Sequence, residues 1–211
     1  MTSTQLLEYA QRLQAIAQAG IAYHRNPYDL ERYQELRALS ARLLEELTDE
    51  PIEKIVRVFA SETGYPTPKV DVRSVIFRGT NEVLLVQEKV DHNNWTLPGG
   101  WADVGCTPFE AAIKEAEEET GLRVKPVRLL AVLDKRKHPH PPQPWYVYKM
   151  FIQCRIEGGE LKQVTPETCG ARWFGKDELP RIQLSTDRVT LSQLENLFRF
   201  AVDPTLLPLC D

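Results

Sequence analysis

The sequence predicts an α/β protein in which a helical N-terminal segment precedes a region of mixed strands and helices. Three observations lead to this class. Apolar residues recur at helical spacing through the first part of the chain, β-rich runs follow a stretch rich in glycine and proline, and a well-capped helix interrupts the strands. With 211 residues and 42% hydrophobic composition, the chain can bury an ordinary core in one or two domains.

The net charge, the lengths of the apolar runs and the cysteine positions exclude several classes of function. A net charge of -4 argues against a general binder of nucleic acids or anionic membranes, although RNA ends stay open as a substrate. No apolar run reaches the ~18 residues of a membrane span, and the N-terminus lacks a signal-peptide pattern. We therefore expect a cytoplasmic protein without a membrane partner. The four cysteines are scattered, so neither a zinc site nor a disulfide framework is predicted.

Three helices are predicted before the first strand. Apolar spacing predicts a helix from residue 3 to about residue 18, with Gly20 as a possible stop. Asp29 is the expected cap of the second helix, and a third should begin after Asp49 with Pro51 in its first turn.

The helical segment is small for an independent core, so its remaining apolar surface should pack against something else. We predict a helical extension over residues 1–62 that serves dimerisation, or alternatively caps its own subunit.

A second domain is predicted over residues 68–211, after a linker that contains two prolines. Residues 70–77 and 83–86 should form a hairpin, because a glycine-containing turn separates two β-rich runs. Later strands are expected at 127–133, 146–156 and 171–174, and a closing helix at 188–201.

The central helix has the clearest local signals in the chain. Thr107 suits the N-cap, Pro108 the first helical position and Glu110 the reciprocal position of a capping box. Gly121 can end the helix in a left-handed conformation. We therefore predict a helix from Pro108 to about Thr120.

Three glutamates share one side of this predicted helix. Glu115, Glu118 and Glu119 are at positions i, i+3 and i+4, so their carboxylates should repel one another unless water or a cation intervenes. Mg²⁺ and Mn²⁺ prefer such oxygen ligands. The alternative is an ordinary solvated acidic face.

The order of these residues resembles the Nudix box. Gly100 opens the motif, and residues 114–122 close it with four glutamates and a glycine. Cys106 stands where the family has its first glutamate, and Lys114 stands where it has arginine, whose planar fork lysine cannot reproduce. The resemblance implies a mixed sheet in an α/β/α sandwich and a Mg²⁺- or Mn²⁺-dependent hydrolase of nucleoside diphosphates linked to another moiety.

The resemblance also implies site residues. Glu115, Glu118 and Glu119 are expected to bind metal, with the backbone of Gly100 as a further oxygen ligand or phosphate support. Glu167, on a loop before a late strand, is a candidate for the base that activates water, with Glu118 and Glu119 as alternatives.

Substrate-binding candidates lie in a loop of basic, histidine and proline residues and beside the glycine pair. The basic side chains suit phosphates, and the aromatic rings suit a base or a quaternary ammonium. Two exposed histidines in a loop, without further ligands, do not suggest a metal site. The candidates are Arg136, Lys137, His138, Trp145 and Trp101.

Similarity beyond the box narrows the expected substrate. Residues 14–18, 29–33, 35–37, 64–73, 95–105 and 138–142 resemble a small bacterial Nudix group with an N-terminal helical extension, whose members resemble dimers. That group includes CDP-choline pyrophosphatases, so the expected reaction converts CDP-choline and water to CMP and phosphocholine. ADP-ribose or another nucleoside-diphosphate sugar is the alternative substrate. A non-catalytic binding module is the alternative class, motivated by Cys106 and Lys114.

Overall fold

The computed structural model describes residues 2–60 and 64–211, except for the side chain of residue 60, and the chain divides into two compact units. One, the helical unit, comprises Met1–Lys69 and Pro141–Tyr146. The other, the sheet unit, comprises Val70–His140 and Val147–Asp211. Among the described residues, no helix combines the length and the apolar character needed to cross a membrane.

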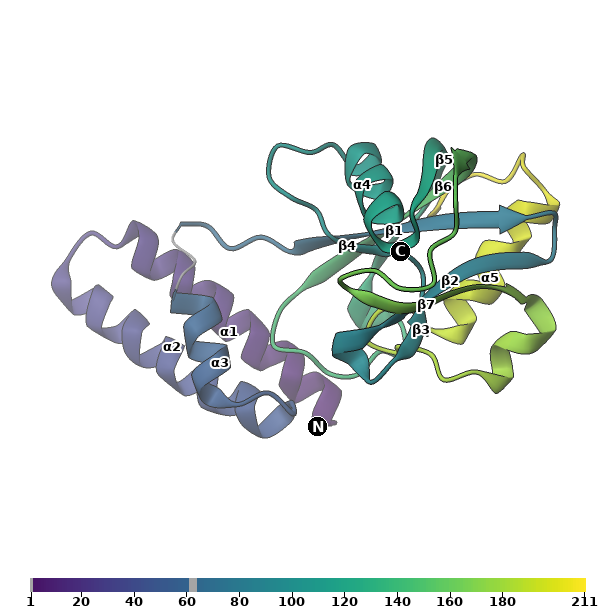
Figure 1. Cartoon of the computed structure of the whole chain (residues 1–211). Helices are drawn as coiled ribbons and strands as arrows, with labels where there is room; N and C mark the ends of the chain where they lie inside the picture. The colour runs from purple at the N-terminus through teal and green to yellow at the C-terminus, as the bar shows by residue number, and fades with distance from the viewer. Residues whose placement is uncertain (1, 61–63) are drawn as a thin grey trace. The chain divides into compact units, whose positions relative to one another are not determined.

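Three helices build the helical unit (Figure 1): α1 (Ser3–Tyr23), α2 (Pro27–Leu47) and α3 (Ile52–Ala60). Their core is small and consists mainly of Ala10, Ala41, Leu44, Ile55 and Phe59. So few buried side chains leave apolar residues on the surface of this unit, as the sequence predicts.

The loop of residues 141–146 also belongs to the helical unit, although it is distant in sequence. The Gln11 side-chain amide donates to the backbone oxygen of Gln143 at 2.6 Å. The Lys54 ammonium lies 6.0 Å from the centre of the Trp145 ring. The loop that carries one predicted substrate-binding residue is therefore held by the helices.

Two details of the predicted helices are wrong. Helix α1 continues through Gly20 to Tyr23, because Gly20 permits close packing instead of ending the helix. A Cβ at this position would lie 2.4 Å from Cδ1 of Tyr33 in α2. The N-cap of α2 is Asn26, whose side chain accepts from the Asp29 N–H at 2.8 Å, while Asp29 itself lies in the first turn.

The sheet unit contains one eight-stranded mixed sheet with strand order β3-β2-β1-β6-β5-β8, in which β4 pairs with β1 and β7 with β2. The strand β8 is parallel to β5, whereas the pairings of β1 with β2 and of β5 with β6 are antiparallel. The strands are β1 (Lys69–Arg78), β2 (Glu82–Glu88), β3 (Asn94–Thr96), β4 (Gly99–Trp101), β5 (Leu122–Asp134), β6 (Val147–Gly159), β7 (Thr168–Gly175) and β8 (Leu209–Cys210).

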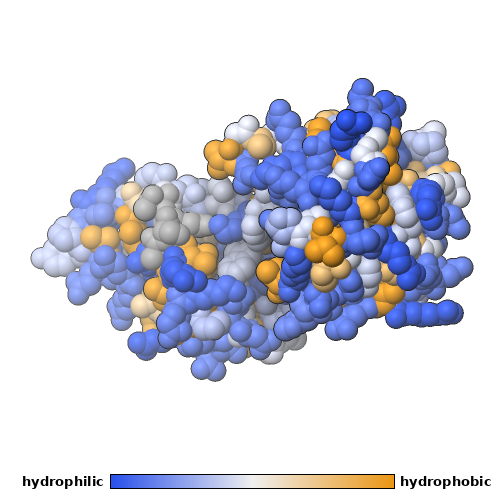
Figure 2. Space-filling model, in the orientation of Figure 1, coloured by the Kyte–Doolittle hydropathy of each residue, from blue (hydrophilic) through white to orange (hydrophobic). Residues whose placement is uncertain are grey.

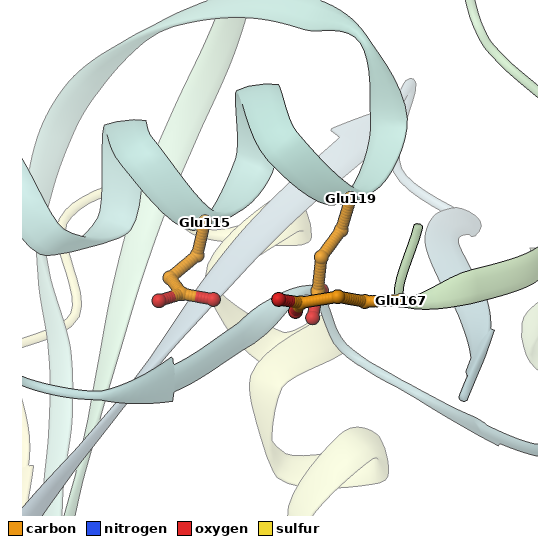
Figure 3. Close-up of side chains that lie close together, drawn as sticks. All are labelled: Glu115, Glu119 and Glu167. Carbon is orange, nitrogen blue, oxygen red and sulfur yellow. The ribbon is translucent and has the colours of Figure 1, made fainter. Parts of the chain in front are cut away.

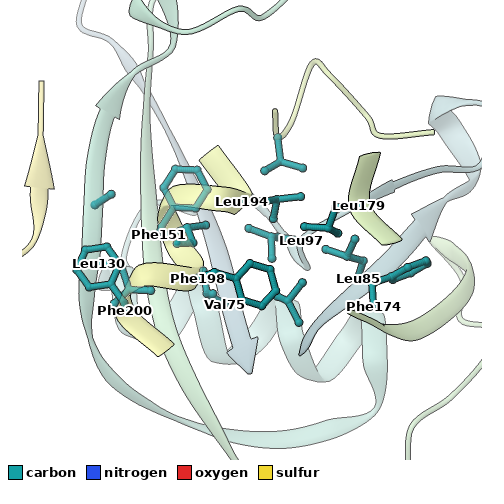
Figure 4. Close-up of a cluster of buried hydrophobic side chains, with 14 of the residues drawn as sticks. Val75, Leu85, Leu97, Leu130, Phe151, Phe174, Leu179, Leu194, Phe198 and Phe200 are labelled. Atoms are coloured by element: carbon teal, nitrogen blue, oxygen red, sulfur yellow. The ribbon is translucent and has the colours of Figure 1, made fainter. Parts of the chain in front are cut away.

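Two helices cover opposite faces of this sheet: α4 (Pro108–Thr120) and α5 (Leu191–Val202) (Figure 1). Side chains alternate along β1, so Val75 packs in the cluster with α5 while Val72 and Ile76 pack in the cluster with α4. Figure 4 shows the α5 cluster, which includes Phe198. The predicted α/β/α arrangement is confirmed.

The predicted hairpin is also confirmed, with Phe77 opposite Val83. The closing helix begins three residues later than expected, because the Thr190 side chain caps it by accepting from the Gln193 N–H. Short 3₁₀ turns at Lys89–Asp91, Lys135–Lys137 and Lys176–Arg181 complete the unit.

Candidate active site

Helix α4 forms as its local signals predict. Thr107 accepts from the Glu110 N–H, and the Glu110 carboxylate accepts from the Thr107 N–H at 2.8 Å, which completes the capping box. Gly121 ends the helix with a φ of 74°, in the left-handed region that glycine tolerates. These signals fix where the helix begins and ends, and hence which way its glutamates point.

Three carboxylates converge in the sheet unit. One oxygen each of Glu115, Glu119 and Glu167 lies within 4.8 Å of the other two (Figure 3). Two come from α4 and the third from the loop before β7, so the group depends on tertiary structure. Glu119 is buried, Glu115 is partly buried and Glu167 is exposed, which leaves the group open to solvent on one side.

Hydrogen bonds fix the loop that carries Glu167. The Thr168 hydroxyl donates to the backbone oxygen of Glu119 at 3.0 Å, which ties the loop to α4. The Lys89 N–H donates to the backbone oxygen of Glu167 at 3.1 Å. The base candidate inferred from the sequence is therefore held beside the two helix glutamates.

The glycine pair lies directly against the carboxylates. The Gly99 N–H donates to Oε2 of Glu119 at 3.0 Å. A Cβ at Gly100 would lie 3.1 Å from Oε2 of Glu115, and one at Gly99 would lie 2.1 Å from the backbone oxygen of Val72. Both glycines therefore permit a backbone approach that a side chain would obstruct.

The negative charges of these three carboxylates are poorly offset by positive groups. Burial, together with the neighbouring carboxylates of Glu88 and Glu115, raises the pKa of Glu119 to about 8 despite the lowering effect of Arg73. Burial also raises the pKa of Glu115. A divalent cation would offset this repulsion, and clustered carboxylate oxygens are suitable ligands for Mg²⁺ or Mn²⁺. The residues therefore fit the expected metal.

Glu118 lies outside the group of three. Its carboxylate is 3.9 Å from the Lys114 ammonium, which also bonds to Asp103 at 2.7 Å. Adjacent helix positions differ by about 100° in direction, so Glu118 and Glu119 point to different sides. The roles of Glu118 in metal binding and catalysis stay predictions.

Two of the predicted substrate-binding side chains pair with carboxylates of the sheet unit. The Arg136 guanidinium bonds to the Asp134 carboxylate at 2.5 Å, and Nε2 of His138 lies 3.2 Å from Oδ2 of Asp211. Lys137 is exposed.

The two tryptophans differ in position. Trp145 belongs to the helical unit. Trp101 directly follows Gly100 in β4 and is 51% exposed, so its ring is open to solvent close in sequence to the glycine pair.

His140 has a structural environment. Its Nδ1 lies 2.5 Å from the backbone oxygen of Thr186, and its Nε2 lies 3.1 Å from the Gln193 side-chain amide nitrogen. Burial lowers the pKa of His140 to about 3, so the ring is neutral. Within residues 2–60 and 64–211, the three glutamates are the one group of potential metal ligands, and no histidine belongs to it.

A buried network of charges beside the site is absent from the sequence-based interpretation. Arg73 lies between Asp71, with Nε 2.9 Å from Oδ1, and Glu88, with Nη1 3.6 Å from Oε1. The Lys149 ammonium bonds to Asp71, and Arg188 pairs with Glu88 at 2.6 Å. Asp71 and Arg73 are charged residues two positions apart in an apolar strand. This pattern is the sequence signal that could have revealed the network.

The chain belongs to the Nudix hydrolase family. It matches the NUDIX domain over residues 67–194, which is more than half of its length. Residues 4–59 match a second family, described as the UDP-X-like, N-terminal oligomerisation domain. Nudix hydrolases act on nucleoside diphosphates linked to another moiety and generally need divalent metal ions, so the chain is an enzyme of this class.

Individual relatives extend this similarity over nearly the whole chain. A Bacillus subtilis protein named "Putative ADP-ribose pyrophosphatase YjhB" is 48% identical over 95% of this chain and 94% of its own length. The structure of an ADP-ribose pyrophosphatase from Streptococcus suis is 36% identical, with a TM-score of 0.61 over 69% of this chain and 100% of its own. A UDP-X diphosphatase structure is 32% identical, with a TM-score of 0.62 and full coverage of both chains.

Proposed function

We propose that this chain hydrolyses the pyrophosphate bond of a nucleoside diphosphate linked to a sugar or an alcohol, with Mg²⁺ or Mn²⁺ held by Glu115 and Glu119 and with Glu167 beside them as the base. The observation that supports the proposal is the approach of these three carboxylates to within 4.8 Å of one another. The backbone of Gly100, which lies against Glu115, is a further candidate ligand. Glu118, on the same helix, is another candidate metal ligand.

A bound divalent cation would neutralise the charge of the diphosphate and lower the pKa of a water molecule. The protein's own groups hold the metal ligands in place and accept the proton. The Gly99 N–H holds the Glu119 carboxylate in place at 3.0 Å. Glu167, exposed on its loop, accepts the proton of the attacking water. The water oxygen forms a bond to one phosphorus, the bridging P–O bond breaks, and two phosphate monoesters leave.

ADP-ribose is the first substrate to test, with AMP and ribose 5-phosphate as products. Two of the similar proteins, from Bacillus subtilis and Streptococcus suis, carry ADP-ribose pyrophosphatase in their names. CDP-choline stays the second candidate. The observation that favours it is Trp101, whose half-exposed ring can attract a quaternary ammonium.

The test is product identification by chromatography after incubation with ADP-ribose, CDP-choline or a UDP-sugar, in Mn²⁺ and in EDTA. Metal-dependent release of AMP and ribose 5-phosphate supports the first substrate, and release of CMP and phosphocholine supports the second. Absence of turnover with every nucleoside diphosphate would contradict the proposal and favour the binding-module alternative.

We further propose that residues 1–62 are a dimerisation segment and residues 68–211 the catalytic domain. The family matched by residues 4–59 is described as an oligomerisation domain. The helical unit also exposes large apolar side chains, and Figure 2 shows apolar groups on its surface. They include Tyr9 and Ile16 on α1 and Leu39 and Leu43 on α2.

Light scattering tests the assembly. Leu39→Glu should halve the mass of the full-length dimer, because a charge cannot be buried in an apolar interface without a large cost. Val164→Glu is the matched control, since Val164 is an exposed residue of the sheet unit. A wild-type mass of one chain, or a Leu39→Glu mass equal to that of a wild-type dimer, would refute this assignment.

A further inference from the structure

Lys114 replaces the arginine of the Nudix box and pairs with groups other than the buried Glu119 carboxylate. Lys114 lies on the exposed side of α4, where its ammonium pairs with Asp103 at 2.7 Å and lies 3.9 Å from Glu118. The carboxylate of Glu119, which is buried, is held instead by the Gly99 N–H at 3.0 Å. The position of Glu119 therefore depends on whatever fixes the segment of residues 97–100.

Arg73 of β1 fixes that segment. Its Nη1 donates to the backbone oxygen of Leu97 at 3.2 Å. Arg73 is also the direct β-pairing partner of Gly99, and a Cβ at Gly99 would lie 2.9 Å from Cδ of Arg73. The next residue of β1, Ser74, donates its N–H to the oxygen of Pro98 at 2.7 Å. The segment is thus bonded to β1 by the Arg73 side chain at Leu97 and by the backbone at Pro98 and Gly99.

The guanidinium is itself held rigidly. Arg73 is only 4% exposed, with Nε 2.9 Å from Asp71 and Nη1 3.6 Å from Glu88. A planar guanidinium can bond in several directions at once, which a single ammonium cannot do in the same geometry. Arg73 therefore connects two buried carboxylates to the backbone that supports Glu119.

We propose that Arg73 is a positioning residue of the metal site: it holds residues 97–100 against β1, so that the Gly99 N–H keeps Glu119 beside Glu115 and Glu167. Arg73 does this from outside the Nudix box, on a separate strand. The inference rests on the proposed metal site and adds a residue that the box does not contain.

The test measures Mn²⁺ binding by electron paramagnetic resonance in the absence of substrate, together with kcat, KM and the melting temperature. Arg73→Lys should weaken Mn²⁺ binding about tenfold or more, because residues that orient metal ligands typically contribute this much. The kcat should fall with it, while KM at saturating Mn²⁺ stays within about twofold. Arg73→Gln should have the larger effect.

Arg188→Lys is the matched control. Arg188 belongs to the same buried network, since it pairs with Glu88 at 2.6 Å. Among the described residues, the Arg188 side chain bonds to Glu88, Asp91 and Ser185 and to none of residues 97–100. This variant should keep the wild-type Mn²⁺ affinity within about twofold, even if its melting temperature falls as much as that of Arg73→Lys.

Asp71→Asn provides a second route if an Arg73 variant fails to fold. It leaves Arg73 in place but removes the charged partner of Nε, so Mn²⁺ binding should weaken by less than in Arg73→Lys. Unchanged Mn²⁺ affinity in folded Arg73→Lys, or in Asp71→Asn, would overturn the proposal. So would an equal loss in Arg188→Lys, or an effect confined to KM. A wild-type protein that binds no Mn²⁺ would instead refute the metal site itself.

Discussion

The replacement of Glu119 by glutamine should stabilise the metal-free protein at high pH and remove its response to metal. Glu119 is 3% exposed, and burial raises its pKa to about 8 from a reference of 4.5. A folded-state pKa above the unfolded value means that the folded state binds the proton more tightly. The stability that this carboxyl contributes is therefore complete below pH 4.5 and is lost as the pH rises through about 8.

The size of the effect follows from the same pKa. One pKa unit corresponds to about 1.4 kcal/mol, so between pH 5 and pH 8 the wild type should lose on the order of 3 kcal/mol relative to Glu119→Gln. That difference corresponds to roughly 10 °C in the melting temperature of a chain of this size. Glu115, Glu88 and Arg73 also interact with Glu119, but they are present in both proteins, so the comparison isolates Glu119.

The assay is thermal unfolding of both proteins at pH 5, 6, 7 and 8, in EDTA and in Mn²⁺. In EDTA the two melting temperatures should diverge as the pH rises. In Mn²⁺ the wild type should gain about 3 kcal/mol when the metal is a hundredfold above its dissociation constant, and the variant should gain little. Parallel pH curves in EDTA, or equal stabilisation of both proteins by Mn²⁺, would refute the reasoning.

Three further substitutions follow from the same geometry. Glu167→Gln should lower kcat about a hundredfold or more without changing the melting temperature, because it removes the proposed base from an exposed loop; full turnover would dismiss that role. Gly99→Ala should lower the free energy of unfolding by on the order of 3 kcal/mol, since its Cβ would lie 2.1 Å from the Val72 oxygen at a φ of +148°; a denaturant midpoint equal to wild type would contradict this. Gly20→Ala gains helix propensity but places a Cβ 2.4 Å from the Tyr33 ring, so urea unfolding should show a net loss of about 1 to 2 kcal/mol rather than a gain.

Local signals made part of the fold predictable from the sequence. The limits of α4 follow from Thr107, Glu110 and Gly121, which act through bonds within a few residues of themselves. The hairpin of β1 and β2 is similarly local. The glutamates of α4 could be placed on one helix for the same reason.

Contacts between segments that are distant in the sequence could not be predicted. Gly20 resembled a helix stop, because its packing against Tyr33 is visible only once α2 is in place. The approach of Glu167 to Glu115 and Glu119 could not be predicted, because it depends on the loop before β7 lying beside α4. The role of Arg73 depends on Glu88 and Leu97, which lie on other segments, so it could not be predicted. Tertiary structure decides which side chains meet, whereas local propensity decides where elements form.

The most direct test of the account is turnover at saturating Mn²⁺ of wild type, Glu119→Gln and Glu117→Gln, each with ADP-ribose and with CDP-choline. Glu117 is an exposed glutamate on the same helix, outside the carboxylate group, so its variant has the same change in charge. The account predicts that Glu117→Gln keeps the wild-type rate and that Glu119→Gln loses it by about a hundredfold or more. Equal rates in the two variants would contradict a metal site built on Glu119.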